Sequence, residues 1–180
     1  MANGTQASGD TAMHVFERAG LGLAPFRVVG CTERRGPIRT MLTDGTMMES
    51  GAPGQPMGCC KYCYTGIAIC YAIKSADGKI FDVGSDCVKR TGDAGMVKTV
   101  NKMITAARHA AEKARIDRAV ALFATPDVRA ALGARPHPVA SMAANGRTLA
   151  DSIAWMFAHA GNAGKIRAAK QVEAAAEVRS

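Results

Sequence analysis

Alternation of apolar and polar positions in the first half of the chain predicts short strands. The segment 65–74 alternates strictly, with Tyr71 and three isoleucines on one face and Cys70 between two alanines on the other. This period of two is typical of a strand with one buried face. Asp77-Gly78 supplies a turn, and residues 79–83 alternate in the same way. Together these segments predict a β-hairpin.

Shorter elements are expected before this hairpin. Residues 12–19 fit a short helix ended by glycine, and residues 26–29 fit a short strand. Residues 39–48 fit two strands joined at Asp44-Gly45, a dipeptide that favours hairpin turns. Residues 50–58 contain three glycines and two prolines, so we expect irregular structure there.

The second half of the chain shows helical periodicity. Apolar residues at helical spacing run from Met96 toward Phe123 and predict one long helix. Asp93 is placed to accept hydrogen bonds from the free N–H groups at its start, and Pro126 prevents its continuation. Three further helices are predicted over residues 126–133, 149–160 and 165–178.

Composition narrows the classes of function. The 180 residues are 48% hydrophobic and 21% charged, as in ordinary soluble proteins. Aromatic residues make up only 5%, so we expect a core of Ala, Val, Ile, Leu and the ten methionines. The formal net charge of +8 favours a polyanionic partner, with nucleic acid first and an acidic protein surface second.

Targeting signals are not seen in the sequence. The first ten residues are small and polar, unlike a signal peptide, and no apolar run approaches the roughly 20 residues that span a bilayer. Six cysteines in such a chain are metal ligands or free thiols more often than disulfides. We therefore expect a cytoplasmic protein without a membrane partner.

Three cysteines stand at a spacing that suits a metal ion. Cys60 and Cys63 form a C-x2-C turn, and Cys87 follows the return strand of the predicted hairpin. Because an antiparallel hairpin brings its end back to its start, the three sulfurs are expected to converge. Thiolate sulfur in a tetrahedral arrangement favours Zn²⁺, which is therefore the expected cofactor. The alternative is that these are small buried thiols without a metal.

The spacing of the cysteines does not by itself identify a fourth metal ligand. A second C-x2-C or a C-x-C motif would need a ligand where Arg90 or Ser85 stands. The available substitutes are Cys59, Cys70, Cys31 and Asp86. Cys59 and Cys70 are favoured, and Cys70 completes the predicted set because it lies on the strand roughly opposite residues 84–85. No general acid or base is evident beside the thiols, so an enzyme with an open zinc position is not expected.

These elements and motifs predict an α+β protein. We expect a small zinc-binding β-hairpin module, of treble-clef or ribbon-like type, followed by an α-helical region. The predicted segments are a disordered tail over residues 1–11, the metal-binding module over 12–92 and the helical region over 93–180. The first half is rich in Gly and Pro, so metal binding would supply folding free energy there.

Residues 58–93 resemble a group of small, uncharacterised proteins of phages and related mobile elements. The resemblance lies in the C-x2-C turn, the hairpin through Asp77-Gly78, and the segment Val-Gly-Ser-Asp-Cys-Val that contains Cys87. It implies metal binding and a mobile-element origin, hence the cytoplasm of a host. A glycine usually follows the second cysteine in this group, whereas this chain has Tyr64. If the turn needs a positive φ there, Tyr64 costs about 1–2 kcal/mol.

Basic residues follow the metal motif. Residues 89–118 contain eight basic and three acidic side chains, and Lys98 and Lys102 share one helical face. Such a row suits a phosphate backbone, and Tyr62 and Tyr64 are candidates for stacking on bases. The predicted nucleic-acid contacts are Lys61, Lys89, Arg90, Lys98, Lys102 and Arg108. We therefore expect a zinc-stabilised protein that binds DNA or RNA; the alternative is an interaction module that binds or inhibits an acidic host protein.

Overall fold

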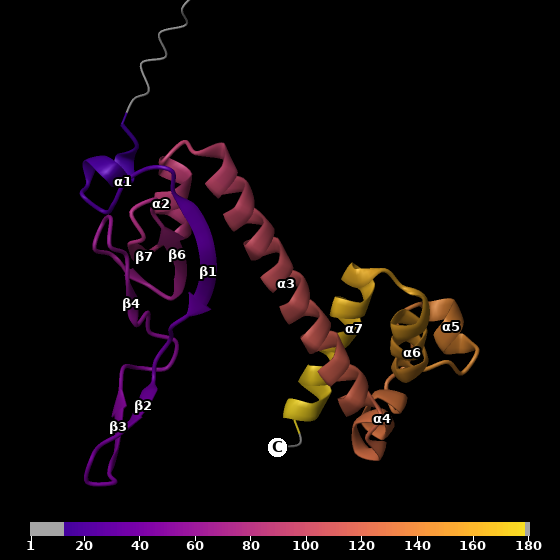
Figure 1. Ribbon diagram of the computed structural model, residues 1–180. Helices are drawn as coiled ribbons and strands as arrows, with labels where there is room; N and C mark the ends of the chain where they lie inside the picture. Colours follow the sequence, from indigo (N-terminus) through magenta and orange to yellow (C-terminus); the bar gives the residue numbers. More distant parts are fainter. Residues whose placement is uncertain (1–12, 179–180) are drawn as a thin grey trace, which may run out of the picture. The chain divides into compact units, whose positions relative to one another are not determined.

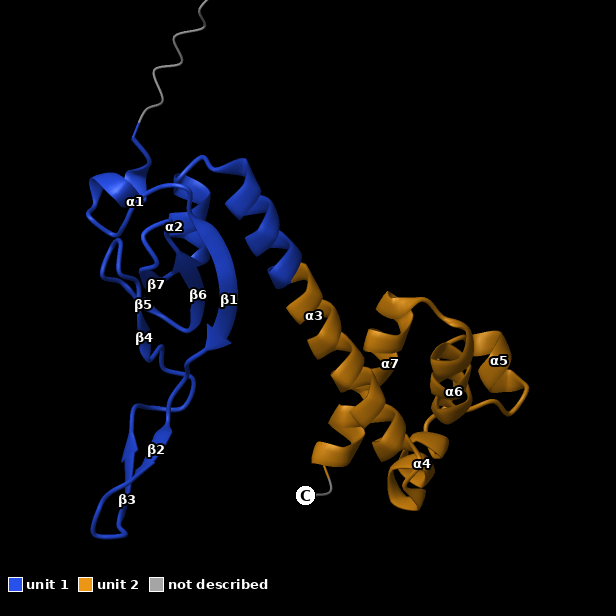
Figure 2. Ribbon diagram, in the orientation of Figure 1, with its two compact units in different colours: residues 1–104 blue, residues 105–180 orange. Residues whose placement is uncertain are grey.

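The computed structural model describes residues 13–178, so the tail predicted over residues 1–11 lies outside the described residues. The chain divides into two compact units, Met1–Ile104 and Thr105–Ser180 (Figure 2). The first contains short strands and helices, and the second is helical (Figure 1). The predicted α+β class is confirmed.

The strands and short helices belong to the first unit. In chain order they are α1 (Val15–Arg18), β1 (Arg27–Glu33), β2 (Ile38–Met41), β3 (Met47–Ser50), β4 (Gly58–Cys59), β5 (Gly66–Ile67), β6 (Ile69–Lys74), β7 (Ile80–Val83) and α2 (Ser85–Arg90). The remaining helices are α3 (Ala94–Phe123), which begins in the first unit and ends in the second, α4 (Pro126–Gly133), α5 (Ala140–Ala144), α6 (Leu149–His159) and α7 (Asn162–Glu177).

The three-stranded antiparallel sheet has the order β1-β6-β7. The predicted hairpin forms its β6–β7 half, with Tyr71 paired to Val83 and Ile73 paired to Phe81. Gly78 adopts a φ of 86° at the turn, which glycine reaches without strain. Two smaller antiparallel pairs, β2–β3 and β4–β5, complete the strands. The β2–β3 hairpin extends away from the three-stranded sheet (Figure 1).

Aromatic rings form the centre of the first unit's core. Phe16 lies 5.7 Å from Phe26 and 5.4 Å from Phe81 between ring centroids, in edge-to-face contacts. Tyr71 and Ile73 pack into the same cluster from β6. The expected core of aliphatic residues and methionine is therefore only part of the core of this unit, which contains Ile73, Val83 and Met96 but also gathers several of the chain's few aromatic residues. Met41, Met47 and Met48 are instead exposed.

Helix α2 was not predicted, and it buries Cys87 and Val88 in this core. Helix α3 begins as expected, because Asp93 Oδ1 accepts a hydrogen bond from the Met96 amide at 2.9 Å. Met96 and Val100 then pack into the first unit's core. The boundary between the units consequently lies within α3, after Ile104, rather than at the predicted position before residue 93.

The second unit has a separate aliphatic core. Leu132 of α4, Ile153 of α6 and Val172 of α7 are fully buried within it. Its polar contacts include a two-point ion pair between the Arg115 guanidinium and the Glu173 carboxylate. Trp155 of α6 stays 58% exposed, so this core does not use the chain's only tryptophan. None of the described helices combines the length and apolar character that crossing a bilayer requires.

Gly58 is the residue of β4 where any side chain would collide with its surroundings. A β-carbon there would lie 2.4 Å from Cys70 Sγ and 2.7 Å from the Ile67 carbonyl oxygen. A β-carbon at Gly66, which pairs with Cys59 in the same two-stranded sheet, would meet only Pro56 at 3.9 Å. Gly58 therefore lets β4 approach β6 closely.

Replacing Gly58 by alanine should destabilise the first unit. We expect Gly58→Ala to lower the free energy of unfolding by about 2 kcal/mol, because a backbone carbonyl must move to admit the methyl group. Gly66→Ala is the matched control and should change stability by less than about 0.5 kcal/mol. Thermal unfolding followed by circular dichroism measures both, and equal effects of the two variants would contradict this packing.

Candidate metal centre

A tight turn places two of the three thiols. Cys60 follows β4, and its N–H donates to the Thr65 carbonyl at 2.9 Å while its carbonyl accepts from the Tyr64 N–H at 2.8 Å. The Lys61 N–H donates to the Asp82 carbonyl at 2.8 Å, which ties the turn to β7. These backbone bonds hold Cys60 and Cys63 in one loop beside the sheet.

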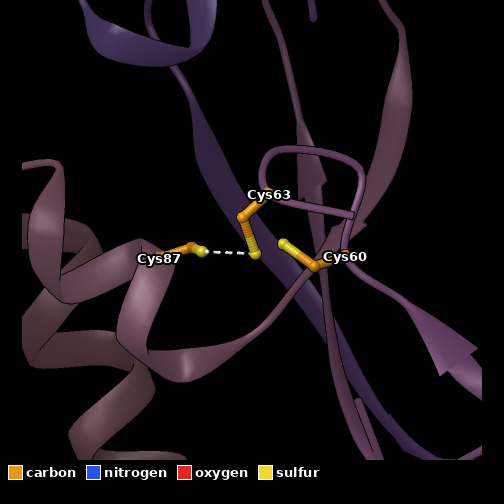
Figure 3. Close-up of side chains that lie close together, drawn as sticks. All are labelled: Cys60, Cys63 and Cys87. Atoms are coloured by element: carbon orange, nitrogen blue, oxygen red, sulfur yellow. Dashed lines mark hydrogen bonds between the residues drawn. The ribbon is translucent and has the colours of Figure 1, made fainter. Parts of the chain in front are cut away.

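The third thiol comes from α2. The β6–β7 hairpin carries the chain back, and α2 starts two residues after β7. Cys87 sits in the first turns of α2, with Val88 beside it in the core. The short helix thus presents the Cys87 sulfur to the loop that holds Cys60 and Cys63 (Figure 3).

The three sulfurs converge. The Sγ atoms of Cys60, Cys63 and Cys87 all lie within 4.8 Å of one another, and they point toward a common centre (Figure 3). Cys87 Sγ lies 3.3 Å from Cys63 Sγ. Cys60 is fully buried, Cys87 is 5% exposed and Cys63 is exposed. Three thiols at these distances from one centre can hold a metal ion.

The protonation of the thiols differs between the buried and exposed positions. Hydrogen bonds with the Thr65 hydroxyl and backbone lower the pKa of Cys63 to about 6. Burial, together with contact to the other two thiols, raises the pKa of Cys87 to about 12. A divalent ion must therefore displace a proton from Cys87, and metal affinity should rise with pH.

Cys70, the predicted fourth ligand, is not part of this group of sulfurs. Alternation along β6 directs Tyr71 and Ile73 into the aromatic core, whereas Cys70 lies on the opposite face against Gly58. Its thiol is fully buried, and this burial raises the pKa of Cys70. Within residues 13–178, no fourth His, Cys, Asp or Glu brings a ligand atom into the cluster.

The other substitutes are placed elsewhere. Cys59 is exposed, and its Sγ lies 3.8 Å from the Cys60 carbonyl oxygen. Cys31 is an exposed residue of β1 opposite Tyr71. The Asp86 side chain is 83% exposed and lies 3.8 Å from Lys89 Nζ. Adjacent residues on a strand or helix point in different directions, which separates Cys59 from Cys60 and Asp86 from Cys87.

A pocket of about 520 Å³ opens beside the cluster, and no pattern in the sequence predicted it. All three cysteines line it, together with Thr65 and Arg90. Thr65 follows Cys63 by two residues and lies 3.3 Å from its sulfur through the hydroxyl oxygen. Arg90 stands one helical turn after Cys87 on α2. The polar environment of the thiols therefore comes from residues next to the ligands in sequence.

The turn after Cys63 places Tyr64 in the left-handed backbone region, the conformation considered above for the position where glycine is usual. Tyr64 has a φ of 60° and is the one residue other than glycine with a positive φ in the part of the chain that the structure describes. Its side chain is 78% exposed. Tyr62, by contrast, packs edge-on against Phe16 with 5.4 Å between centroids. Of the two tyrosines proposed for stacking, Tyr64 is exposed and Tyr62 is half-buried.

The six predicted nucleic-acid contacts are all exposed. Lys89 lies 3.8 Å from Asp86, and Arg108, in the second unit, lies 3.9 Å from Glu112. The other four form no ion pair with any described residue; they are Lys61, Arg90, Lys98 and Lys102. These four belong to the first unit, as does the thiol cluster.

Comparison with known proteins adds no relative. No family model, curated protein or solved structure matches the chain. The interpretation of the site therefore depends on its geometry and chemistry alone.

Serine substitution should distinguish the cysteines that bind the metal from those that do not. Cys60→Ser, Cys63→Ser and Cys87→Ser should each lose bound metal and lower the free energy of unfolding by about 3 kcal/mol or more, because a ligand is lost. Cys31→Ser, at an exposed position outside the cluster, should keep about one metal ion per chain and is the control. Elemental analysis of the purified variants measures the metal content. Full metal retention in the Cys87→Ser variant would contradict the assignment.

Substitution of Tyr64 should reveal the strain at the turn. Tyr64→Gly should raise the free energy of unfolding by about 0.5–1 kcal/mol, because relief of the left-handed conformation outweighs the added freedom of the unfolded chain. Tyr64→Ala removes the same exposed ring but keeps the strain, so it should show no such gain. Both are compared by thermal unfolding in the same excess of metal. An equal response of the two variants would show that the turn stores no strain.

Proposed function

We propose that this protein is a zinc-stabilised nucleic-acid-binding protein. Three thiolates around one centre favour Zn²⁺, because it accepts soft sulfur ligands and imposes no geometry through its d-electrons. The burial of Cys60 and Cys87 in the aromatic core makes the ion part of the folded first unit. The resemblance of residues 58–93 to phage and mobile-element proteins supports the same metal and a role in a host cytoplasm.

The observation that carries the proposal is the set of unpaired cations around the metal centre. Lys61 lies between the ligands Cys60 and Cys63, and Arg90 lies on the helix that carries Cys87. Both are exposed, and neither forms an ion pair with a described residue. A metal ion that joins the loop to α2 would therefore also hold together the two segments that carry these cations. Basic side chains that have no acidic partner in the protein are available to contact a phosphate backbone.

Helix α3 carries two further exposed lysines of the first unit. Lys98 and Lys102 are one turn apart on the same face, exposed, and without an ion pair among the described residues. Met96 and Val100, on the other side of the same turns, anchor this part of α3 in the first unit's core. The two lysines are thus presented by a helix that is packed against the metal-bearing unit.

Tyr64 suits contact with unpaired bases. Its exposed ring projects from the metal loop, next to the ligand Cys63. Stacking on one base contributes about 1–3 kcal/mol and tolerates any sequence. A strained tyrosine that the fold does not need for packing is consistent with a contact of this kind.

A second function is favoured by the β2–β3 hairpin. Pairing of Ile38 with Ser50 and of Thr40 with Met48 forms one face without charge. The opposite face contains Met41 beside Met47, which are 70% and 57% exposed. Exposed apolar side chains on both faces of a two-stranded hairpin are typical of a protein contact. This observation favours the alternative, an interaction module for a host protein.

Salt dependence of oligonucleotide binding tests the proposed function. The zinc-loaded protein should bind a fluorescent single strand with an affinity that falls steeply as salt rises. Lys98→Gln/Lys102→Gln should weaken binding for every sequence and reduce the salt slope by about 1.4, because two phosphate contacts are lost and each contributes about 0.7 on a single strand. Fluorescence anisotropy at several salt concentrations provides the measurement.

The control removes the same charge from another surface. Arg167 and Lys170 of α7 are exposed, so Arg167→Gln/Lys170→Gln should leave the salt slope within about 0.5 of the parent value. Absence of oligonucleotide binding at low salt would contradict the proposal. If the protein binds no oligonucleotide but binds a host protein, and Met41→Thr/Met47→Thr abolishes that contact, the alternative function as an interaction module would be established.

A further inference from the structure

We infer that the metal ion held by Cys60, Cys63 and Cys87 takes its fourth ligand from solution, and that this ligand is a small thiol bearing a carboxylate. The inference rests on the metal centre of the proposed function and goes beyond nucleic-acid binding. It makes the centre a binding site for a small molecule as well as a structural element.

The protein supplies three ligands and no fourth among the described residues. The three Sγ atoms lie within 4.8 Å of one another, and no other His, Cys, Asp or Glu of residues 13–178 joins them. Cys70 is on the opposite face of β6, against Gly58, and therefore faces away from the centre. Three protein ligands with one free position is the arrangement of zinc sites that bind a substrate or water, whereas purely structural sites are closed by four.

The free position faces a pocket rather than packed protein. The pocket of about 520 Å³ is lined by all three ligand cysteines. Its other walls are apolar at Ile67 and Ile69 and polar at Thr65 and Arg90. A volume of this size falls within the range of small-molecule sites, which combine apolar walls with a few polar groups.

The donor set selects sulfur for the fourth position. A centre that already has three thiolates is soft and prefers another soft ligand to a carboxylate or a phosphate oxygen. When the thiol binds, its S–H bond breaks, the sulfur electron pair forms the bond to the metal, and the proton leaves to solvent. No electron is transferred, so no oxidant or reductant is needed.

Arg90 selects the second group of the ligand. It is exposed at the pocket wall and forms no ion pair with a described residue, so its guanidinium is available to a carboxylate. It also offsets the net negative charge of a divalent ion with four thiolates. Asp86 lines the same pocket with the opposite charge, but Lys89 lies 3.8 Å from its carboxylate. The wall therefore favours a thiol that carries an anionic group over a neutral one.

Cobalt substitution makes the fourth ligand visible. The full chain is reduced with a phosphine, freed of thiols and loaded with Co²⁺, whose absorption reports the number of sulfur ligands. We expect a three-sulfur spectrum that becomes a four-sulfur spectrum on addition of 3-mercaptopropionate, and no change with 3-hydroxypropionate.

Arg90→Gln should weaken 3-mercaptopropionate binding roughly tenfold, about the contribution of one charge-assisted hydrogen bond, and leave 2-mercaptoethanol binding within about twofold. Arg90→Lys, which keeps the charge but loses the two-point geometry, should fall between.

The outcomes separate this inference from the proposed function. A four-sulfur spectrum before any thiol is added, lost in Cys59→Ser or Cys70→Ser, would overturn the inference and leave the metal centre intact. A three-sulfur spectrum that 3-mercaptopropionate does not alter would overturn it in the same way. An absence of cobalt absorption would overturn the metal centre and this inference together. Oligonucleotide binding is measured separately, so its loss would count against the proposed function alone.

Discussion

The structure of the first unit brings three sulfurs to one point, where they can hold a metal ion. Cys60 and Cys63 come from a loop after β4, and Cys87 comes from α2, on the far side of the β6–β7 hairpin in sequence. Metal bonds to the three sulfurs would join these segments and would exclude unfolded conformations in which they separate. Without an ion, three thiols within 4.8 Å of one another would gain little from their proximity. The same ion would hold Lys61, Arg90 and Tyr64 in fixed positions, which links stability to the proposed recognition of nucleic acid.

The aromatic core and the sulfur cluster support each other. Cys60 and Cys87 are buried in the cluster of residues that includes Phe16, Phe26 and Phe81. The core thus positions two ligands, while Cys63, at the exposed side, faces the pocket with Thr65 and Arg90. This division leaves one side of the centre buried and the other accessible. A site that is buried on one side and open on the other suits both a stabilising ion and an exchangeable ligand.

The sequence predicted the parts of the fold that depend on local rules. Period-two alternation located β6 and β7, the Asp-Gly dipeptides located two hairpin turns, and Asp93 located the start of α3. The three converging thiols followed from their spacing around the hairpin. The fourth ligand did not, because alternation placed Cys70 on the face opposite Tyr71 and Ile73 but did not show which of the two faces the three sulfurs share. Nor did sequence spacing reveal that the few aromatic residues would gather in one core, or that α3 would begin inside the first unit.

Amide hydrogen exchange with and without metal is the most direct test of the central claim. The reduced protein is compared in excess Zn²⁺ and after removal of metal by a strong chelator, with exchange resolved along the sequence by mass spectrometry. The account predicts that residues 58–90 lose protection on chelation, while the helices of the second unit, with their own aliphatic core, keep it. Unchanged protection of residues 58–90 in chelator would contradict a metal ion as the organising element of the first unit.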